Sequence, residues 1–189
     1  ERHIRVLVHQ QNFQYTLVNN MQIFLFIIIL LATFITMEGI TWLTHKYVMH
    51  GFLWYLHEDH HKPNPGVFEK NDAFFLIFSI PSILCIAFGV VNKTYWLAAI
   101  GFGIALYGLA YFIVHDVIIH QRLKFFTRSN NVYVRTIRWA HKMHHKHMDK
   151  YEGESFGMLM VAKKYWHKVK ADKKRNKNKS FVPGNRSAI

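Results

Sequence analysis

Three long apolar segments restrict this chain more than any other feature of its sequence. They cover about residues 21–43, 73–91 and 95–114, and Glu38 is the one charged residue within them. A helix of about 20 mostly apolar residues crosses the hydrocarbon core of a bilayer. The first segment is too long for a secretory signal peptide, and no small-residue cleavage pattern follows it. We therefore predict an all-α integral membrane protein with three to four transmembrane helices, and we exclude a soluble globule.

The charges predict how these segments face the membrane. Only Asn92, Lys93 and Thr94 separate the second segment from the third, so the two should form a tight antiparallel hairpin. Residues 45–72 and the chain after residue 115 then lie on one side of the membrane, and they carry most of the Lys and Arg residues. The positive-inside rule predicts that this polar face is cytoplasmic in a multi-pass inner (cytoplasmic) membrane protein.

The two ends of the chain differ from the predicted membrane domain at residues 21–162. Residues 1–20 are polar up to Met21, so we interpret them as an upstream extension before a natural start at Met21, or as a short extracytoplasmic arm. The segment 163–189 is strongly basic, with ten Lys or Arg against one Asp over residues 163–186. We predict a disordered cytoplasmic tail that is attracted to anionic lipid rather than to nucleic acid.

Histidine is the second constraint, because ten of the fourteen histidines fall into four clusters. The motif HxxxxH is followed by HxxHH, and this order occurs twice, each time beginning where an apolar segment ends. Two HxxHH motifs in one chain are improbable by chance even at this histidine content. The ten residues are His45, His50, His57, His60, His61, His115, His120, His141, His144 and His145.

The spacing of these histidines predicts a metal centre. Positions i, i+3 and i+4 share one face of an α-helix, so each HxxHH should offer three imidazoles in one direction, the second on an amphipathic helix over about residues 131–146. Positions i and i+5 lie about 140° apart, so each HxxxxH should bracket a site, with one histidine serving each of two ions. Ten imidazoles exceed what one ion can hold, and imidazole suits Fe, Zn, Cu and Ni. Cys85 is the sole cysteine, which excludes a disulfide framework and cysteine-based metal sites.

Histidine ligands usually donate their other ring N–H to a carboxylate or carbonyl group. Glu38 lies seven residues before His45, on nearly the same helix face, and a carboxylate inside a membrane is expected to point into the bundle. The candidates for supporting the histidines are Glu38, Glu58, Asp59, Asp72, Asp116, Arg122 and Glu152.

The residues around the histidines resemble the β-carotene hydroxylase branch of the membrane-bound fatty acid hydroxylase/sterol desaturase superfamily. The resemblance covers about residues 37–160, through HKYVMHG, HEDHHKPNPGVFEKNDAF, YGLAYFIVHDVIIHQR and HKMHHKHMDKYEGESFGML. Residues 1–20 and the basic tail lie outside it, and residues 51–57 are more aromatic than is usual in relatives. Matching residues besides the histidines are Glu69, Asn71, Asp72, Asp116, Gln121, Arg122, Ser155, Phe156 and Gly157.

This resemblance implies a non-haem di-iron monooxygenase. Two iron ions held by the ten histidines would use O2 to hydroxylate the β-ionone rings of carotenoids at C3 and C3′, from β-carotene through β-cryptoxanthin to zeaxanthin. The two electrons would come from a separate donor, such as ferredoxin or an NAD(P)H-linked reductase, because the sequence has nothing like a flavin, haem or nicotinamide site. No catalytic residue is expected beyond the metal site. The expected substrate-lining residues are Phe74, Phe78, Tyr107 and Tyr111.

Two alternatives stay open at the level of sequence. The same chemistry could act on a fatty acyl, sterol or sphingoid substrate, because the histidine spacing does not report the substrate. A non-enzymatic metal transporter or haem-binding membrane protein is the more distant alternative. Transport would need polar ligands at mid-membrane, where the chain offers little beyond Glu38, Ser79 and Cys85, and haem would need single histidines within the apolar segments.

Overall fold

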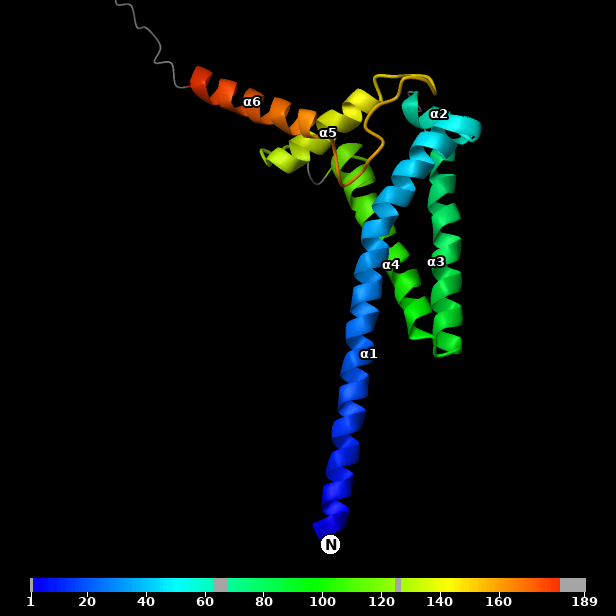
Figure 1. Ribbon diagram of the computed structural model, residues 1–189. Coiled ribbons are helices and arrows are strands. Elements are labelled where there is room, and N and C mark those ends of the chain that lie inside the picture. The colour runs from blue at the N-terminus through cyan, green and yellow to red at the C-terminus, as the bar shows by residue number, and fades with distance from the viewer. Residues whose placement is uncertain (1, 63–67, 125–126, 181–189) are drawn as a thin grey trace, which may run out of the picture. The chain divides into compact units, whose positions relative to one another are not determined.

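The structure is a computed structural model that describes residues 2–62, 68–124 and 127–180 (Figure 1). These residues form helices, turns and loops, which agrees with the predicted all-α class. Two short elements, η1 and η3, are π-helical, and η2 is a single 3₁₀ turn. The elements in chain order are α1 (Arg2–Leu43), η1 (Thr44–Phe52), α2 (Trp54–His61), η2 (Lys70–Asp72), α3 (Ala73–Val91), α4 (Tyr95–Tyr111), η3 (Phe112–Ile119), α5 (Val132–His144) and α6 (Lys163–Ser180).

The chain divides into two compact units. The first contains the chain up to Gly39 together with Asp72–Leu109, and the second contains Ile40–Asn71 together with the chain from Ala110 onward. The first unit thus holds most of the apolar helices, and the second holds all ten clustered histidines.

Three helical stretches among the described residues are long and apolar enough to cross a membrane: Gln10–Phe52, Lys70–Val91 and Tyr95–Ile119. Large apolar side chains such as Ile35, Leu76 and Ile83 are exposed on them. An apolar surface of this length is unfavourable in water and favourable against the hydrocarbon of a membrane. The chain is a membrane protein, as the sequence predicts.

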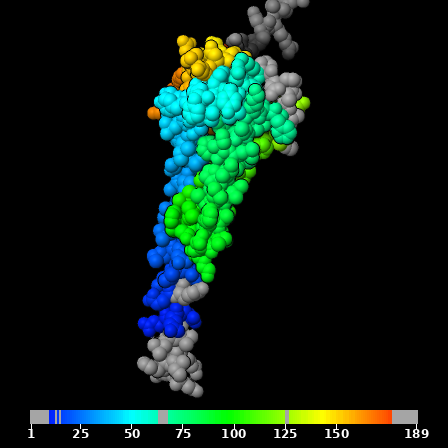
Figure 2. Space-filling model, turned by 90° about the vertical axis from the view of Figure 1, so that its right-hand side faces the viewer, coloured from blue at the N-terminus to red at the C-terminus, as the bar shows by residue number. Residues whose placement is uncertain are grey.

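Small residues on α4 let its neighbours in the first unit approach closely. A Cβ atom added at Gly103 would lie 2.6 Å from Cβ of Thr33 on α1, and one at Gly101 would lie 2.7 Å from the carbonyl oxygen of Ser82 on α3. The Ser82 hydroxyl donates a hydrogen bond of 2.8 Å to the carbonyl oxygen of Gly101. Figure 2 shows the green segments of α3 and α4 lying along the blue α1.

The turn between α3 and α4 is as tight as the three-residue spacing predicts. Lys93 adopts a left-handed conformation with φ 55°, and the amide of Thr94 donates to the carbonyl oxygen of Gly89 at 2.7 Å. These features end α3 and reverse the chain, so α4 begins directly at Tyr95.

The predicted disorder of the basic tail is wrong for residues 163–180, which form the helix α6. Tyr165 and Val169 are buried, one helical turn apart, and Trp166 lies with its ring centroid 5.8 Å from that of Tyr133 on α5. An apolar stripe of this kind stabilises a helix by packing even when most of its residues are basic. Residues 181–189 of the predicted tail lie outside the described residues. At the other end, α1 is helical from Arg2 onward.

Candidate metal centre

The second unit gathers all ten clustered histidines into two adjacent groups. In the first histidine group, one ring nitrogen from each member lies within 4.8 Å of those of the others: His45, His50, His57, His61 and His144. The second histidine group meets the same criterion with His60, His120, His141 and His145. We include His115 in the second group, because its Nε2 lies 3.1 Å from Nε2 of His60.

Both HxxxxH pairs lie in π-helical turns, which corrects one prediction. On an α-helix the two histidines of each pair would diverge, but in η3 the amide of His120 donates to the carbonyl oxygen of His115 at 2.8 Å, five residues earlier. A turn closed by i→i+5 bonds brings residues five apart onto one face. The rings of His115 and His120 therefore lie 4.4 Å apart between centroids, and those of His45 and His50 5.3 Å apart. Each pair contributes to one group instead of dividing between two.

The HxxHH triplets do divide between the groups. On α2, His57 and His61 belong to the first group and His60 to the second. On α5, His144 belongs to the first group and His141 and His145 to the second. Each group thus contains one pair, two residues of one triplet and one residue of the other.

The local sequence explains how α5 presents its triplet. The side-chain Oδ1 of Asn131 accepts hydrogen bonds from the amides of Tyr133 and Val134, at 2.8 and 3.3 Å, and so caps the helix. Ile137 and Ala140 are buried on the same side as His141 and His144. The amphipathic helix predicted for this segment is confirmed.

The ring nitrogens of the first group converge as metal ligands do. The Nδ1 atoms of His45 and His57 lie 3.1 and 2.7 Å from the carbonyl oxygen of Phe156 and from Oδ1 of Asn71. Because these oxygens can only accept, each Nδ1 carries the ring proton, and each Nε2 presents a lone pair. Yet the two Nε2 atoms lie only 3.1 Å apart. Lone pairs at this distance repel one another unless a cation binds both.

The separations between nitrogens fit such a cation. Bonds from imidazole to zinc are about 2.0–2.1 Å long, so neighbouring nitrogens around an ion of this size lie about 3 Å apart. The Nε2 atom of His141 lies 2.8 Å from Nε2 of both His120 and His145 in the second group. The corresponding distance between His50 and His144 in the first group is 3.3 Å. Both groups suit metal ions.

Burial keeps these imidazoles in the form that binds a metal. Together with smaller contributions from neighbouring histidines, it lowers the pKa of His57 to about 2 and that of His145 to about 3. Burial likewise lowers the pKa of His61 to about 4. The pKa values of His60, His120, His141 and His144 are lowered by burial and by adjacent imidazoles. A neutral imidazole can ligate a metal without first losing a proton.

The loop after α5 supplies backbone acceptors that the sequence analysis did not anticipate. Carbonyl oxygens of the loop lie 2.8 Å from Nδ1 of His61, 2.9 Å from Nδ1 of His144 and 3.4 Å from Nδ1 of His50. They belong to His147, Glu154 and Lys150. Glu152 and Ser155 in this loop have positive φ values of 59° and 63°, a conformation that costs energy for residues other than glycine. Glu152 contributes to this turn of the backbone and is exposed.

Charged side chains support the second group. Glu69 Oε2 accepts from Nδ1 of His60 at 2.7 Å and from Nη2 of Arg122 at 2.9 Å. The Nε atom of Arg122 lies 3.2 Å from Oδ1 of Asp116, whose Oδ2 lies 3.5 Å from Nδ1 of His115. The structure thus brings the predicted Asp116 and Arg122 to this group and adds Glu69, which the sequence analysis noted only as a matching residue.

Other predicted supporting residues have different contacts. Asp59 Oδ2 accepts from the amide of Lys70 at 2.6 Å, which holds the turn that carries Glu69 and Asn71. Glu58 is exposed at the surface and pairs with Lys62. Glu38 lies in the first unit, where its Oε2 accepts a hydrogen bond of 2.7 Å from the Tyr107 hydroxyl. Roles beside the histidines stay predictions for Glu38 and for Asp72, which precedes α3.

The predicted substrate-lining residues lie on α3 and α4. Phe74 and Tyr107 are buried, and Phe78 and Tyr111 are half-buried. The ring of Tyr111 stacks on that of His115, with centroids 4.7 Å apart and an interplanar angle of 29°. Tyr111 therefore lies directly against a histidine of the second group.

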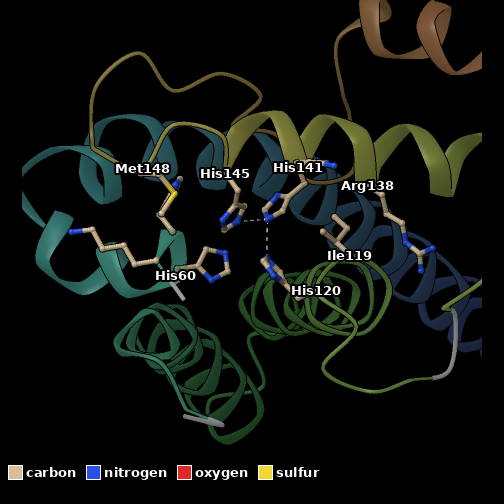
Figure 3. Close-up of a pocket in the computed structure, with 10 residues that line it drawn as sticks. His60, Ile119, His120, Arg138, His141, His145 and Met148 are labelled. Carbon is tan, nitrogen blue, oxygen red and sulfur yellow. Dashed lines mark hydrogen bonds between the residues drawn. The ribbon is translucent and has the colours of Figure 1, made fainter. Parts of the chain in front are cut away.

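An open pocket of about 420 Å³ reaches the second group. Figure 3 shows His141 between His120 and His145, with their ring nitrogens pointing toward one another and His60 facing them. The pocket is also lined by Ile119, Arg138 and Met148, which Figure 3 labels, and by Lys62 and Lys142. Small molecules from the solvent can therefore reach this group.

The fold and the clustered histidines define a membrane protein with a candidate metal centre. The chain belongs to the fatty acid hydroxylase family, whose profile matches residues 29–168. It is 41% identical over 137 residues to a β-carotene hydroxylase of Pseudescherichia vulneris, covering 72% of this chain and 77% of that one. It is 43% identical over 133 residues to a β-carotene hydroxylase of Pantoea ananas, covering 70% and 75%.

More distant relatives include a chloroplastic β-carotene 3-hydroxylase of an Oncidium hybrid cultivar. That match has 36% identity over 119 residues and covers 61% of this chain and 38% of the relative. No solved structure matches the chain. The predicted resemblance to this superfamily and to its β-carotene hydroxylases is confirmed.

Proposed function

We propose that this protein is a membrane di-iron monooxygenase that hydroxylates the β-ionone rings of carotenoids at C3 and C3′. It would convert β-carotene through β-cryptoxanthin to zeaxanthin, with O2 as co-substrate and two electrons from a separate donor. The convergence of the ten clustered histidines, eight of them buried and two half-buried, into two groups carries the di-iron part of this proposal. The names and the 41–43% identity of the bacterial relatives support the carotenoid part.

The two histidine groups would each hold one iron ion. Bound iron would supply the activation of O2, which no side chain can carry out. The protein's own part is to keep the imidazoles neutral, fixed and shielded. Burial keeps the imidazoles neutral and shields them from solvent. The acceptors at the outer Nδ1 atoms fix the orientation of the rings. The residues proposed as ligands are His45, His50, His57, His61, His144, His60, His115, His120, His141 and His145.

The substrate would be an apolar polyene taken from the membrane. Tyr111 would contact a β-ionone ring, since its own ring already lies against His115. Phe74, Phe78 and Tyr107 would line the more distant part of the path. The exposed apolar surfaces of α1, α3 and α4 would face the lipid in which this substrate dissolves.

The electrons would reach the second histidine group through its open pocket. Lys62, Arg138 and Lys142 give the lining of this pocket a basic character. An acidic redox protein such as ferredoxin would be attracted to such a surface. The excess of Lys and Arg in the segments that bear the histidines supports a cytoplasmic location for the metal centre.

A bacterial host engineered to accumulate β-carotene tests the proposal. The native protein, His144→Ala and His167→Ala would be expressed to equal levels, and the pigments separated by chromatography. His144 is completely buried within the first group, whereas His167 is exposed on α6. We expect mono- and dihydroxylated pigment from the native protein and from His167→Ala, and none from His144→Ala.

Other outcomes would overturn separate parts of the proposal. Absence of conversion by folded protein that contains iron and is supplied with a donor would overturn the carotenoid substrate. The fatty acyl, sterol and sphingoid lipids of the same cells would then be examined for hydroxylation or desaturation. A Soret band in the optical spectrum of the purified protein would indicate haem and overturn the non-haem iron centre.

A further inference from the structure

The two histidine groups differ in the charge of the groups that support them. In the first group, the five Nδ1 atoms face one side-chain amide, that of Asn71, and four backbone carbonyl oxygens. All five acceptors are neutral. In the second group, Nδ1 of His60 donates to the carboxylate of Glu69, and Nδ1 of His115 lies 3.5 Å from Oδ2 of Asp116 without forming a hydrogen bond to it.

Arg122 joins these two carboxylates. Its Nη2 lies 2.9 Å from Oε2 of Glu69 and its Nε 3.2 Å from Oδ1 of Asp116, so one guanidinium bridges the two carboxylates. These three side chains together carry one net negative charge at the Nδ1 side of His60, whereas Lys62, Arg138 and Lys142 line the pocket.

The backbone is built to place Arg122 there. Gln121, directly after His120, adopts a left-handed conformation with φ 55°. The amide of Arg122 then donates to the carbonyl oxygen of Asp116 at 2.9 Å, which folds the chain back under η3. A left-handed glutamine is unfavourable by itself, so the contacts of Arg122 must compensate for it.

We propose that the second histidine group binds its metal ion more tightly than the first, because Glu69, held by Arg122, acts as a positioning residue that makes the ligand His60 more basic. A carboxylate behind a ligating imidazole orients the ring and strengthens its bond to the metal. Asn71 gives the same orientation to His57 in the first group but adds no charge. This inference rests on the proposed di-iron function and deepens it.

Ferrous ion binding under anaerobic conditions tests the inference without any carotenoid. The purified protein in detergent would be stripped with a chelator and dialysed against graded free Fe²⁺, and bound iron would be measured by mass spectrometry. His45→Ala/His50→Ala leaves the second group intact, and His120→Ala/His141→Ala leaves the first. We expect the intact second group to bind Fe²⁺ at least about 10-fold more tightly than the intact first group.

Two further substitutions assign the difference to charge. Glu69→Gln keeps an acceptor for His60 but removes the charge, and should weaken the intact second group by about 10- to 100-fold without affecting the first. Asn71→Asp adds a charge behind His57 and should strengthen the first group. Glu69→Asp, which keeps the charge, should restore most of the affinity of the second group.

Equal affinities of the two groups would overturn the inference, as would a Glu69→Gln effect of equal size on both. Circular dichroism and gel filtration would show whether each variant is folded. If the histidine or Glu69 variants do not fold, the inference is decided by whether Asn71→Asp strengthens iron binding by the first group. Two equal binding steps in a protein that still hydroxylates β-carotene would overturn this inference and leave the proposed function intact. Two unequal Fe²⁺-binding steps in a protein without hydroxylase activity would support this inference and overturn the proposed function.

Discussion

The backbone N–H of His120 donates a hydrogen bond to the carbonyl oxygen of His115, five residues earlier, at 2.8 Å. This π-helical bond brings two imidazoles together that an α-helix would separate by about 140°. The HxxxxH spacing is therefore matched to a π-turn. The same geometry in η1 brings together His45 and His50.

Changing the length of η3 tests this relationship. Deletion of Val117 leaves His115 and His120 four residues apart, and an ordinary α-helical turn places such residues on one face. Insertion of an alanine after Ile118 leaves them six apart, about 240° around an α-helix. We expect the deletion variant to keep two iron ions per chain and the insertion variant to lose about one, as measured by metal analysis of the purified proteins. Two ions in the insertion variant would contradict the role given to the π-turn.

The Tyr107–Glu38 hydrogen bond in the first unit should stabilise the membrane helices. Both side chains are buried, and replacement of Tyr107 by Phe deprives the Glu38 carboxylate of this donor. We expect Tyr107→Phe to cost about 1–3 kcal/mol in unfolding free energy, measured by thermal denaturation in detergent. Tyr95→Phe, at an exposed position on α4, is the matched control and should have little effect.

A double-mutant cycle separates this bond from general packing. If the bond is responsible, Tyr107→Phe combined with Glu38→Gln should cost less than the sum of the two single substitutions. Additive costs would indicate that the two residues stabilise the helices independently.

The helix α6 should depend on its contact with α5. Val169 is buried among basic residues, and an aspartate at this position would place a charge in that contact. We expect Val169→Asp to release α6 and to accelerate cleavage by trypsin within Lys163–Ser180 several-fold. His167→Ala changes an exposed neighbour without adding or removing a trypsin site. Equal cleavage rates for the two variants would show that the buried stripe does not hold the helix.

The sequence predicted what depends on regular periodicity. The bounds of α3 agree with the predicted span of residues 73–91, and α5 lies within its predicted range, because apolar runs and the i, i+3, i+4 pattern report these helices directly. The prediction that each HxxxxH pair serves two ions was wrong because the angle of about 140° between its histidines holds for an α-helix and not for a π-helix. The α6 helix was missed because two apolar residues one turn apart are a weak signal within a basic segment.

The supporting acceptors were harder to predict for a different reason. Every residue has a backbone carbonyl, so the sequence does not indicate that those of Glu154 and Phe156 accept from histidines. Their positions depend on strained residues such as Ser155. Glu69 supports His60 from nine residues away, across a turn whose geometry no spacing rule gives. The division of each HxxHH between two groups likewise depends on where α2 and α5 lie within the second unit.

Acid should destabilise the metal-free protein. The folded-state pKa values of His57, His61 and His145 are lowered from an ordinary value of 6.5 to about 2, 4 and 3. As the pH falls below about 6.5, the unfolded chain takes up protons at these residues while the folded protein does not. Each such histidine then removes about 1.4 kcal/mol of stability per pH unit, until the pH reaches its folded-state pKa.

The midpoint of thermal unfolding of chelator-treated protein in detergent, measured at pH 7.5, 6.5 and 5.5, checks this expectation. The midpoint should change little between pH 7.5 and 6.5 and fall steeply between pH 6.5 and 5.5. Protein loaded with Fe²⁺ should unfold at a higher temperature than metal-free protein at pH 7.5, because a metal that binds only the folded state stabilises it. This difference should shrink as the pH falls, since protons compete with the metal for the same nitrogens. A midpoint of the metal-free protein that stays constant or rises between pH 6.5 and 5.5 would contradict a cluster of buried, neutral imidazoles.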